Sequence, residues 1–138
     1  MTVSDEHDIP SKSPLAGYVS ADEAGVACLS VTADAAHGDT IVLTVSGEVD
    51  FETAGDLRAA VFDALAPGPT RVVLDLAGLR FMDSSGMGVI VGGWQRARQV
   101  DVRYVLRRVP PVIAEQFEMT GLDQVLTIED DRDDASAA

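Results

Sequence analysis

The sequence predicts an α/β fold, in which α-helices pack on a mixed β-sheet of about five strands. Short runs rich in β-branched residues alternate along the chain with segments whose apolar residues recur every three or four positions. Glycine and proline residues separate the two kinds of segment, and the resulting order is β-β-α-β-α-β-α-β. This alternation favours a sheet with right-handed helical connections.

The first two strands are expected at residues 28–33 and 40–46. The second run is rich in β-branched residues and alternates in polarity, which is typical of a half-buried strand. Residues 35–39 between them predict a turn. The preceding residues 1–27 combine prolines, glycines, serines and acids without periodicity, and we expect them to form a flexible N-terminal extension.

The first helix is expected directly after the second strand. Asp50 is a suitable N-cap, because its side chain can accept hydrogen bonds from the first free N–H groups of a helix. The Pro-Gly-Pro sequence at 67–69 ends the helix. Its predicted inward face carries Phe51, Ala54, Leu57, Val61 and Leu65.

A second helix is expected between two further strands. The mostly apolar run at 71–76 is typical of a central strand, and residues 77–82 are expected to form a loop. The helix follows and ends near Gln99, and the next strand is expected at 102–106. Trp94 lies on the apolar side of this helix, so we expect it to be at least half buried. That side carries Met87, Ile90, Val91, Trp94 and Ala97.

The third helix is expected to start at Pro110-Pro111, because proline in the first turn loses no hydrogen bond. Gly121 suits the left-handed position that closes a helix, and Leu122 can pack back on it. A last strand is expected at 125–128, and we expect residues 129–138 to form an acidic disordered tail. The predicted inward face of the helix carries Val112, Ile113 and Phe117.

Length and charge narrow the possible functions. The 138 residues fit a single domain, which we expect at 28–128, and the net charge is −13. Such a chain is repelled by phosphates, which disfavours direct nucleic-acid binding and anionic membranes as partners. Cys28 is the single cysteine, which fits a reducing compartment and predicts a cytoplasmic location. Because the sequence has no Cys/His cluster, neither a metal nor another cofactor is expected.

The segment Asp-Ser-Ser-Gly-Met-Gly at 83–88 lies between the predicted loop and the second helix. Asp83 or Ser84 can cap the helix and leave several first-turn N–H groups free, so an anion or a phosphate on Ser84 or Ser85 would be accommodated there. Four glycines occur in this helix, at 86, 88, 92 and 93. Each interior glycine costs about 1 kcal/mol relative to alanine. Their presence predicts close approach of the helix to the sheet or to a partner.

On the pattern alone, the segment is adequately explained as a helix cap. A dinucleotide-binding loop would need a third glycine where Val91 stands. A serine hydrolase would need a G-x-S-x-G motif and a histidine near Ser84, and neither is predicted. A phosphate-binding loop would need a lysine after its glycines, but Lys12 is the only lysine. No catalytic constellation is found, so we do not expect an enzyme.

Three stretches together resemble the STAS domain of bacterial anti-sigma factor antagonists. They are Thr-Val-Ser-Gly-Glu-Val-Asp at 44–50, the stretch 73–90 with its Asp-Ser-Ser-Gly block, and Phe-x-Met-Thr-Gly-Leu at 117–122. The resemblance covers roughly residues 29–128, in the expected order. It implies that the predicted domain at 28–128 is a STAS domain.

The resemblance also implies a function. Members of that family bind an anti-sigma factor with GHKL-type serine kinase activity and so release a sigma factor. The kinase phosphorylates the serine after the motif aspartate, which breaks the complex, and a PP2C-type phosphatase restores binding. The implied acceptor here is Ser84, with Ser85 as the weaker candidate. The implied partner-binding residues are Glu48, Asp50, Asp83, Ser84, Ser85, Gly86 and Met87.

A second function is compatible with the same fold. In this alternative the chain is a STAS accessory module that is not phosphorylated and binds a small molecule, a lipid or a transport ATPase. The intact Asp-Ser-Ser sequence at 83–85 favours the phosphorylated switch over this alternative.

Overall fold

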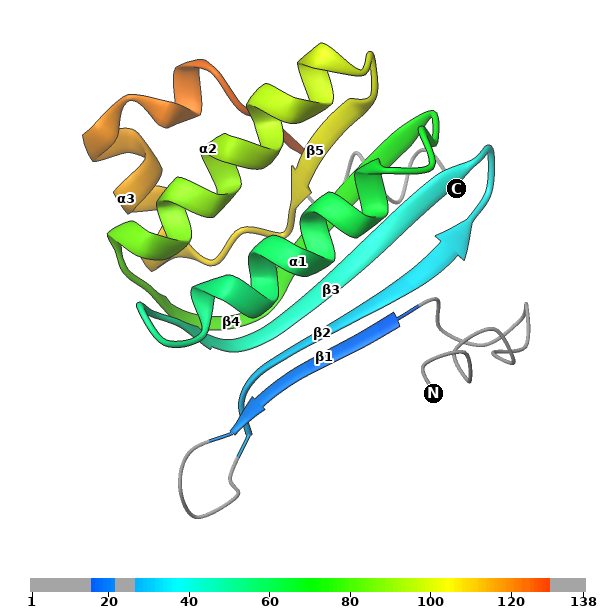
Figure 1. Ribbon diagram of the computed structural model, residues 1–138. Helices are drawn as coiled ribbons and strands as arrows, with labels where there is room; N and C mark the ends of the chain where they lie inside the picture. The colour runs from blue at the N-terminus through cyan, green and yellow to red at the C-terminus, as the bar shows by residue number, and fades with distance from the viewer. Residues whose placement is uncertain (1–15, 22–26, 130–138) are drawn as a thin grey trace.

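The computed structural model describes residues 16–21 and 27–129, with a six-stranded sheet in the order β1-β2-β3-β4-β5-β6 (Figure 1). The β1–β2 and β2–β3 pairs are antiparallel, and the remaining pairs are parallel. The strands are β1 Ala16–Ala21, β2 Ala27–Ala36, β3 Thr40–Val49, β4 Arg71–Met82, β5 Arg103–Arg107 and β6 Thr127–Glu129. The helices are α1 Ala54–Leu65, α2 Ser84–Gln99 and α3 Pro111–Thr120, with a 3₁₀ turn η2 at Leu122–Gln124.

The predicted order of elements is confirmed from β2 onward, and the structure adds β1 at the edge of the sheet. This strand lies inside the predicted extension 1–27, and its residues pair with β2 from Ala16↔Ala33 to Ala21↔Ala27. The sequence AGYVSA shows no regular alternation of apolar and polar residues, so pairing with a neighbour decides its conformation rather than local pattern. Residues 1–15, 22–26 and 130–138 lie outside the described residues, so the predicted extension and tail boundaries stay predictions.

β4 extends further than predicted. The expected loop at 77–82 is wrong, because β4 continues to Met82 along β3. Register shifts between Thr44 and Ser46 and between Gly47 and Glu48 interrupt the regular alternation in this half of the pair. A side chain on Gly78 would meet the Ser46 Oγ at 2.6 Å. The irregular pairing explains why residues 77–82 do not show a strand pattern.

α1 begins later than the periodicity indicates. Its first residue is Ala54, and Phe51 lies in the preceding turn with 83% of its surface exposed, so the prediction that Phe51 faces inward is wrong. The other predicted inward residues of α1 are buried. Asp50 caps the turn rather than the helix itself: its Oδ1 accepts hydrogen bonds from the N–H groups of Glu52 and Thr53, at 2.9 and 3.0 Å.

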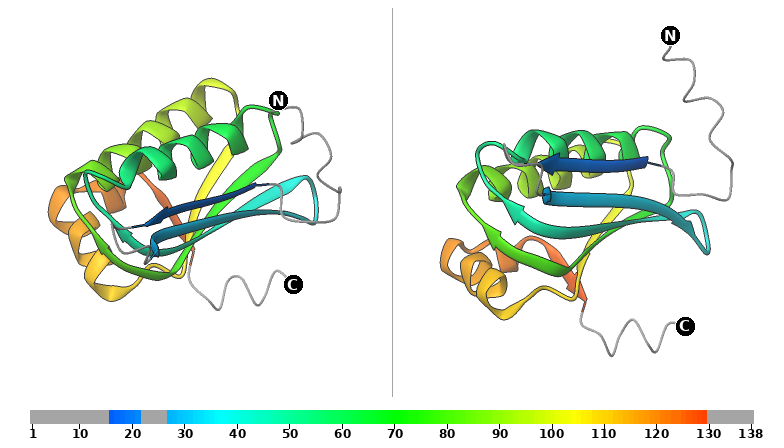
Figure 2. Two further views of the ribbon diagram at one scale, coloured as in Figure 1. Left: turned by 60° about the horizontal axis from the view of Figure 1, so that its bottom comes forward. Right: turned by 90° about the horizontal axis from the view of Figure 1, so that it is seen from below.

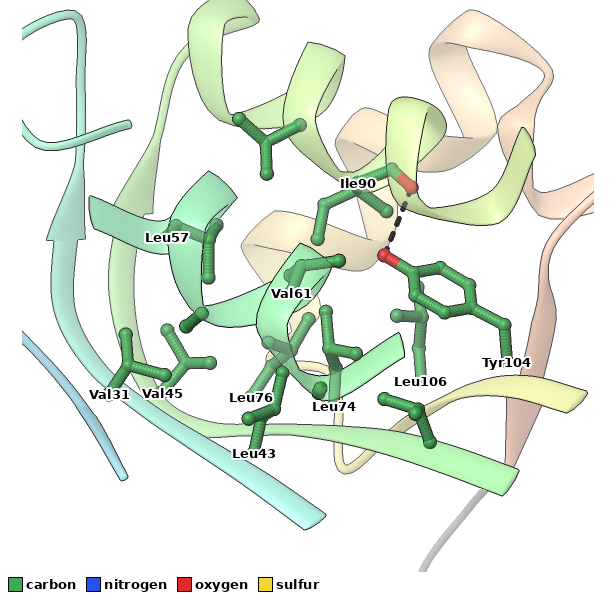
Figure 3. Close-up of a cluster of buried hydrophobic side chains, with 14 of the residues drawn as sticks. Val31, Leu43, Val45, Leu57, Val61, Leu74, Leu76, Ile90, Tyr104 and Leu106 are labelled. Carbon is green, nitrogen blue, oxygen red and sulfur yellow. Dashed lines mark hydrogen bonds between the residues drawn. The ribbon is translucent and has the colours of Figure 1, made fainter. Parts of the chain in front are cut away.

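α1 and α2 lie side by side over the same face of the sheet (Figure 2). Between them and the strands is the core, in which β2 to β5 contribute aliphatic residues that point toward the two helices (Figure 3). Tyr104 of β5 reaches into this core, and its hydroxyl donates a hydrogen bond to the Ile90 carbonyl of α2 at 3.1 Å. Burial raises the pKa of Tyr104. The labelled core residues are Val31, Leu43, Val45, Leu57, Val61, Leu74, Leu76, Ile90, Tyr104 and Leu106.

The prediction that Trp94 of α2 is at least half buried is confirmed. Its side chain is mostly buried and packs against the core, with the Arg98 guanidinium 5.0 Å from its ring centre. No helix in the described ranges is long and apolar enough to cross a membrane.

α3 starts and ends as predicted. Pro110 and Pro111 begin it, and Gly121 closes it in the left-handed conformation at φ 79°. Ile113 and Phe117 are buried as expected, but Val112 is 55% exposed, so its predicted inward position is wrong. Residues 122–124 form the η2 turn, and for this reason the last strand is Thr127–Glu129 rather than 125–128.

Candidate functional site

The predicted functional residues gather at one edge of the sheet. β3 and β4 run parallel, so their carboxyl ends meet there, and α1 and α2 both begin at this edge, in the lower left of Figure 1. The registers Glu48↔Phe81 and Val49↔Met82 hold the two strand ends together. The Asp83 N–H donates to the Val49 carbonyl at 3.0 Å, which fixes the start of α2 against the end of β3.

Asp83 is the N-cap of α2. Its backbone is extended, and its Oδ1 accepts hydrogen bonds from the N–H groups of Ser85, at 2.8 Å, and Gly86, at 3.4 Å. The Met87 N–H donates to the Asp83 carbonyl at 3.1 Å. The prediction that several first-turn N–H groups stay free is therefore wrong, since the Asp83 carboxylate engages those of Ser85 and Gly86 and the Met87 N–H makes the first regular helix bond. A carboxylate already occupies the positive end of the helix.

The two serines differ in accessibility. Ser84 is the first residue of α2 and is exposed, whereas Ser85 is partly buried and its N–H is bound by Asp83. Gly86 is buried and Met87 is partly buried against the core. Within the predicted set, Gly86 contributes close packing, and Ser84 presents its hydroxyl at the surface.

The turn between β3 and α1 carries the acidic part of the predicted site. Glu48 is exposed, and its carboxylate lies 3.7 Å from the Arg80 guanidinium in an exposed ion pair, a kind of contact that contributes little to stability. Asp50 is partly buried and is committed to the turn by its hydrogen bonds to Glu52 and Thr53. The acidic side chains Glu48 and Asp50 thus lie at the same sheet edge as Ser84.

Two supporting residues were not predicted. Gln116 of α3 donates from its Nε2 to the Met82 carbonyl at 2.8 Å and ties α3 to the end of β4. Thr53 is 4% exposed; its hydroxyl donates to the Glu48 carbonyl at 3.0 Å and accepts from the Asp50 N–H at 2.9 Å. A Thr three residues after Asp50 was a possible signal for this turn, but nothing local marks Gln116.

The four glycines of α2 fall into two pairs. A side chain on Gly86 would overlap Met82 and meet the Val49 Cγ1 at 2.8 Å, and one on Gly93 would overlap Tyr104 and meet the Val61 Cγ1 at 2.7 Å. A side chain on Gly88 or Gly92 would meet nothing within 4 Å. The predicted close approach of α2 to the rest of the fold is therefore confirmed for Gly86 and Gly93, while Gly88 and Gly92 look outward.

Other charged groups serve the scaffold. Asp75 is 3% exposed in β4, and its carboxylate pairs with the guanidinium groups of Arg107, at 3.7 Å, and Arg108. Burial raises the pKa of Asp75, but the Arg108 hydrogen bond, the Ala77 N–H and the two positive charges outweigh burial and hold it below its usual value. Across the described ranges, no three side chains of the metal-binding types gather in one place.

The chain is similar to known proteins over most of its length. Residues 32–135 match the family model described as the STAS domain. Over 95 residues the chain is 32% identical to an anti-sigma F factor antagonist of Paenibacillus polymyxa, covering 68% of this chain and 81% of that relative. The crystal structure of an anti-sigma factor antagonist from Mycobacterium paratuberculosis superposes with a TM-score of 0.71 and 25% identity, covering 79% of this chain and 92% of that one.

The fold is also similar to that of SpoIIAA, a Bacillus cell fate determinant whose structure is known in the phosphorylated form. The TM-score is 0.61 at 24% identity, over 78% of this chain and 97% of that one.

Proposed function

The chain belongs to the STAS domain family, and on that premise we propose that it is an anti-sigma factor antagonist switched by phosphorylation of Ser84. It binds an anti-sigma factor with GHKL-type serine kinase activity and so frees a sigma factor in the cytoplasm. A PP2C-type phosphatase restores binding. The chain itself acts as a binding protein and kinase substrate rather than as an enzyme.

The observation that carries the proposal is the arrangement at the start of α2. Ser84 is exposed at the first helical position, directly after an aspartate whose carboxylate accepts hydrogen bonds from the Ser85 and Gly86 N–H groups of that helix end. A kinase can reach the Ser84 hydroxyl without unfolding any part of the domain. Ser85 is the poorer acceptor, because it is partly buried and its backbone is held by Asp83.

A phosphate on Ser84 would act on binding rather than on folding. It adds about −1.5 to −2 charges. The helix dipole favours such a charge by about 0.3–1 kcal/mol, and repulsion from the neighbouring Asp83 carboxylate opposes it. These two effects are of similar size and opposite sign, so the phosphorylated domain stays folded.

In a complex the balance is different. Asp83 already engages most of the first-turn N–H groups that could otherwise receive a phosphate, so a dianion on Ser84 would be buried at the interface with few donors from α2. Burying an unpaired charge costs several kcal/mol. We expect phosphorylation to weaken partner binding by about 100-fold or more, since each 1.4 kcal/mol corresponds to a factor of ten.

The assignment of Ser84 is tested by incubating the wild type, Ser84→Ala and Ser85→Ala with the cognate kinase and ATP. Mass spectrometry of the digested chains then locates the phosphate. We expect the wild type and Ser85→Ala to be modified at Ser84, and Ser84→Ala to resist modification while still binding the anti-sigma factor. Phosphorylation of Ser84→Ala at the wild-type rate would refute the assignment.

A further inference from the structure

Phe51 is the most exposed large apolar residue in the described part of the chain, with 83% of its surface accessible. It lies in the turn between β3 and α1, outside the helix whose apolar face it was predicted to join. Apolar side chains of this size are commonly buried, and aromatic residues are enriched at the centres of protein interfaces. The exposure of Phe51 therefore points to a contact outside the chain.

The turn that carries Phe51 is held in one conformation on both sides. The Asp50 Oδ1 accepts hydrogen bonds from the Glu52 N–H and the Thr53 N–H, at 2.9 and 3.0 Å. The Thr53 hydroxyl also donates to the Glu48 carbonyl at 3.0 Å. A side chain presented by a preformed turn loses little further backbone entropy on binding, which is the property of an effective anchor.

Phe51 is also close to the proposed switch. Val49, two residues before it, accepts a hydrogen bond from the N–H of Asp83, and Asp83 directly precedes Ser84. A protein that covers Ser84 therefore reaches the β3–α1 turn without leaving the same sheet edge (Figure 1).

The charged side chains around Phe51 indicate the charge of the surface that it binds. Glu48, Asp50 and Glu52 all lie within three residues of it and outnumber the Arg80 guanidinium that pairs with Glu48, in a chain whose net charge is −13. A second copy of the chain meeting this turn about a two-fold axis would bring the same acids together, which disfavours self-association. The complementary surface is an apolar pocket bordered by Arg or Lys side chains.

We propose that Phe51 is a specificity-determining anchor, which inserts into an apolar pocket with a basic rim on the anti-sigma factor. The inference rests on the proposed function, because it names the chemistry of the same partner. The exposed Glu48 and Glu52 select partners by charge, and Phe51 supplies the buried contact.

The test compares the wild type with Phe51→Ala and Phe51→Leu for affinity to the anti-sigma factor by calorimetry. Val125→Ala is the matched control, because Val125 is also an exposed apolar residue, 45% accessible, and precedes β6 at the amino ends of the parallel strands. We expect Phe51→Ala to lose about 30-fold or more in affinity, as for an interface hot spot, and Phe51→Leu to lose less. Val125→Ala should bind as the wild type does, and all melting temperatures should be similar.

The outcomes separate this inference from the proposed function. If the wild type binds, its Ser84-phosphorylated form does not, and Phe51→Ala binds like the wild type, the anchor is overturned while the proposed function stands. If the unmodified wild type does not bind any anti-sigma factor, the proposed function itself fails. If ultracentrifugation shows wild-type dimers that Phe51→Ala dissociates, the occupant is a second copy, and the anchor is overturned as well.

Discussion

Glycine residues lie on both faces of α2, but their surroundings differ. On the face toward the core, a side chain at Gly86 or Gly93 would overlap Met82 or Tyr104, so only glycine fits there. Toward the outside, Gly88 and Gly92 meet nothing within 4 Å, although each costs about 1 kcal/mol of helix propensity relative to alanine. The fold explains the first pair, but it gives no reason for the second.

Gly88 and Gly92 lie on the same side of α2 as Ser84. Residues 84, 88 and 92 follow one another at four-residue spacing, so they share one face of α2. This face presents helix backbone with little side chain over it. Under the proposed function, a partner that covers Ser84 can approach the helix closely along Gly88 and Gly92, which would offset their intrinsic cost.

The largest effect is expected from replacing the inward glycines of α2 by alanine, which tests the difference between its two faces. Gly86→Ala and Gly93→Ala should each lower stability, because overpacking costs about 1–3 kcal/mol, and better helix propensity returns only about 1 kcal/mol. Thermal unfolding followed by circular dichroism measures the change. Unchanged or raised melting temperatures in both variants would show that α2 is not packed closely against Val49 and Val61.

Tyr104 provides a second test of the inward face, of about 1 kcal/mol. Tyr104→Phe removes its hydrogen bond to the Ile90 carbonyl, and such a bond contributes about 0.5–1.5 kcal/mol. Burial raises the pKa of Tyr104, so the folded state favours the protonated phenol. The stability that Tyr104 provides is therefore complete below about pH 10, the pKa in the unfolded chain, and declines as the pH rises above it.

Urea unfolding between pH 8 and pH 11 checks this dependence. The loss of stability at high pH should be smaller in Tyr104→Phe than in the wild type. Identical pH profiles for the two proteins would mean that Tyr104 is not buried against α2.

The outward face should respond with the opposite sign and the smallest change in stability. Gly88→Ala and Gly92→Ala are expected to raise the free energy of unfolding by about 0.5–1 kcal/mol, because alanine is the better helix former and has room there. The same variants should bind the anti-sigma factor more weakly. If the variants are more stable and bind as tightly as the wild type, Gly88 and Gly92 do not contact the anti-sigma factor.

The sequence alone predicted the elements whose apolar residues keep a regular period. The alternation of β3, the helical spacing of α2 and the left-handed Gly121 are local signals, and the structure agrees with them. It could not predict β1 or residues 77–82 of β4, since pairing with a neighbouring strand stabilises both. Phe51 continued the helical period of α1, but the Asp50 turn places it outside the helix.

The candidate site shows the same division. Asp83 and Ser84 form a local motif, which predicted the start of α2 at this point and marked both residues as possible caps. The hydrogen bond from Gln116 to the Met82 carbonyl joins residues 34 apart in the chain, and no local pattern predicts it. The occupation of the helix end by the Asp83 carboxylate also required the structure, because the motif alone allows either Asp83 or Ser84 to cap.

The most direct test of the account is the affinity of the anti-sigma factor for this chain before and after phosphorylation of Ser84, measured together with the melting temperature of each form. We predict that phosphorylation weakens binding by about 100-fold or more and that the phosphorylated chain unfolds cooperatively within a few degrees of the unmodified chain. Equal affinities for the two forms would contradict the switch. A phosphorylated chain that is already unfolded at the temperature of the binding measurement would contradict the claim that the phosphate acts on the interface.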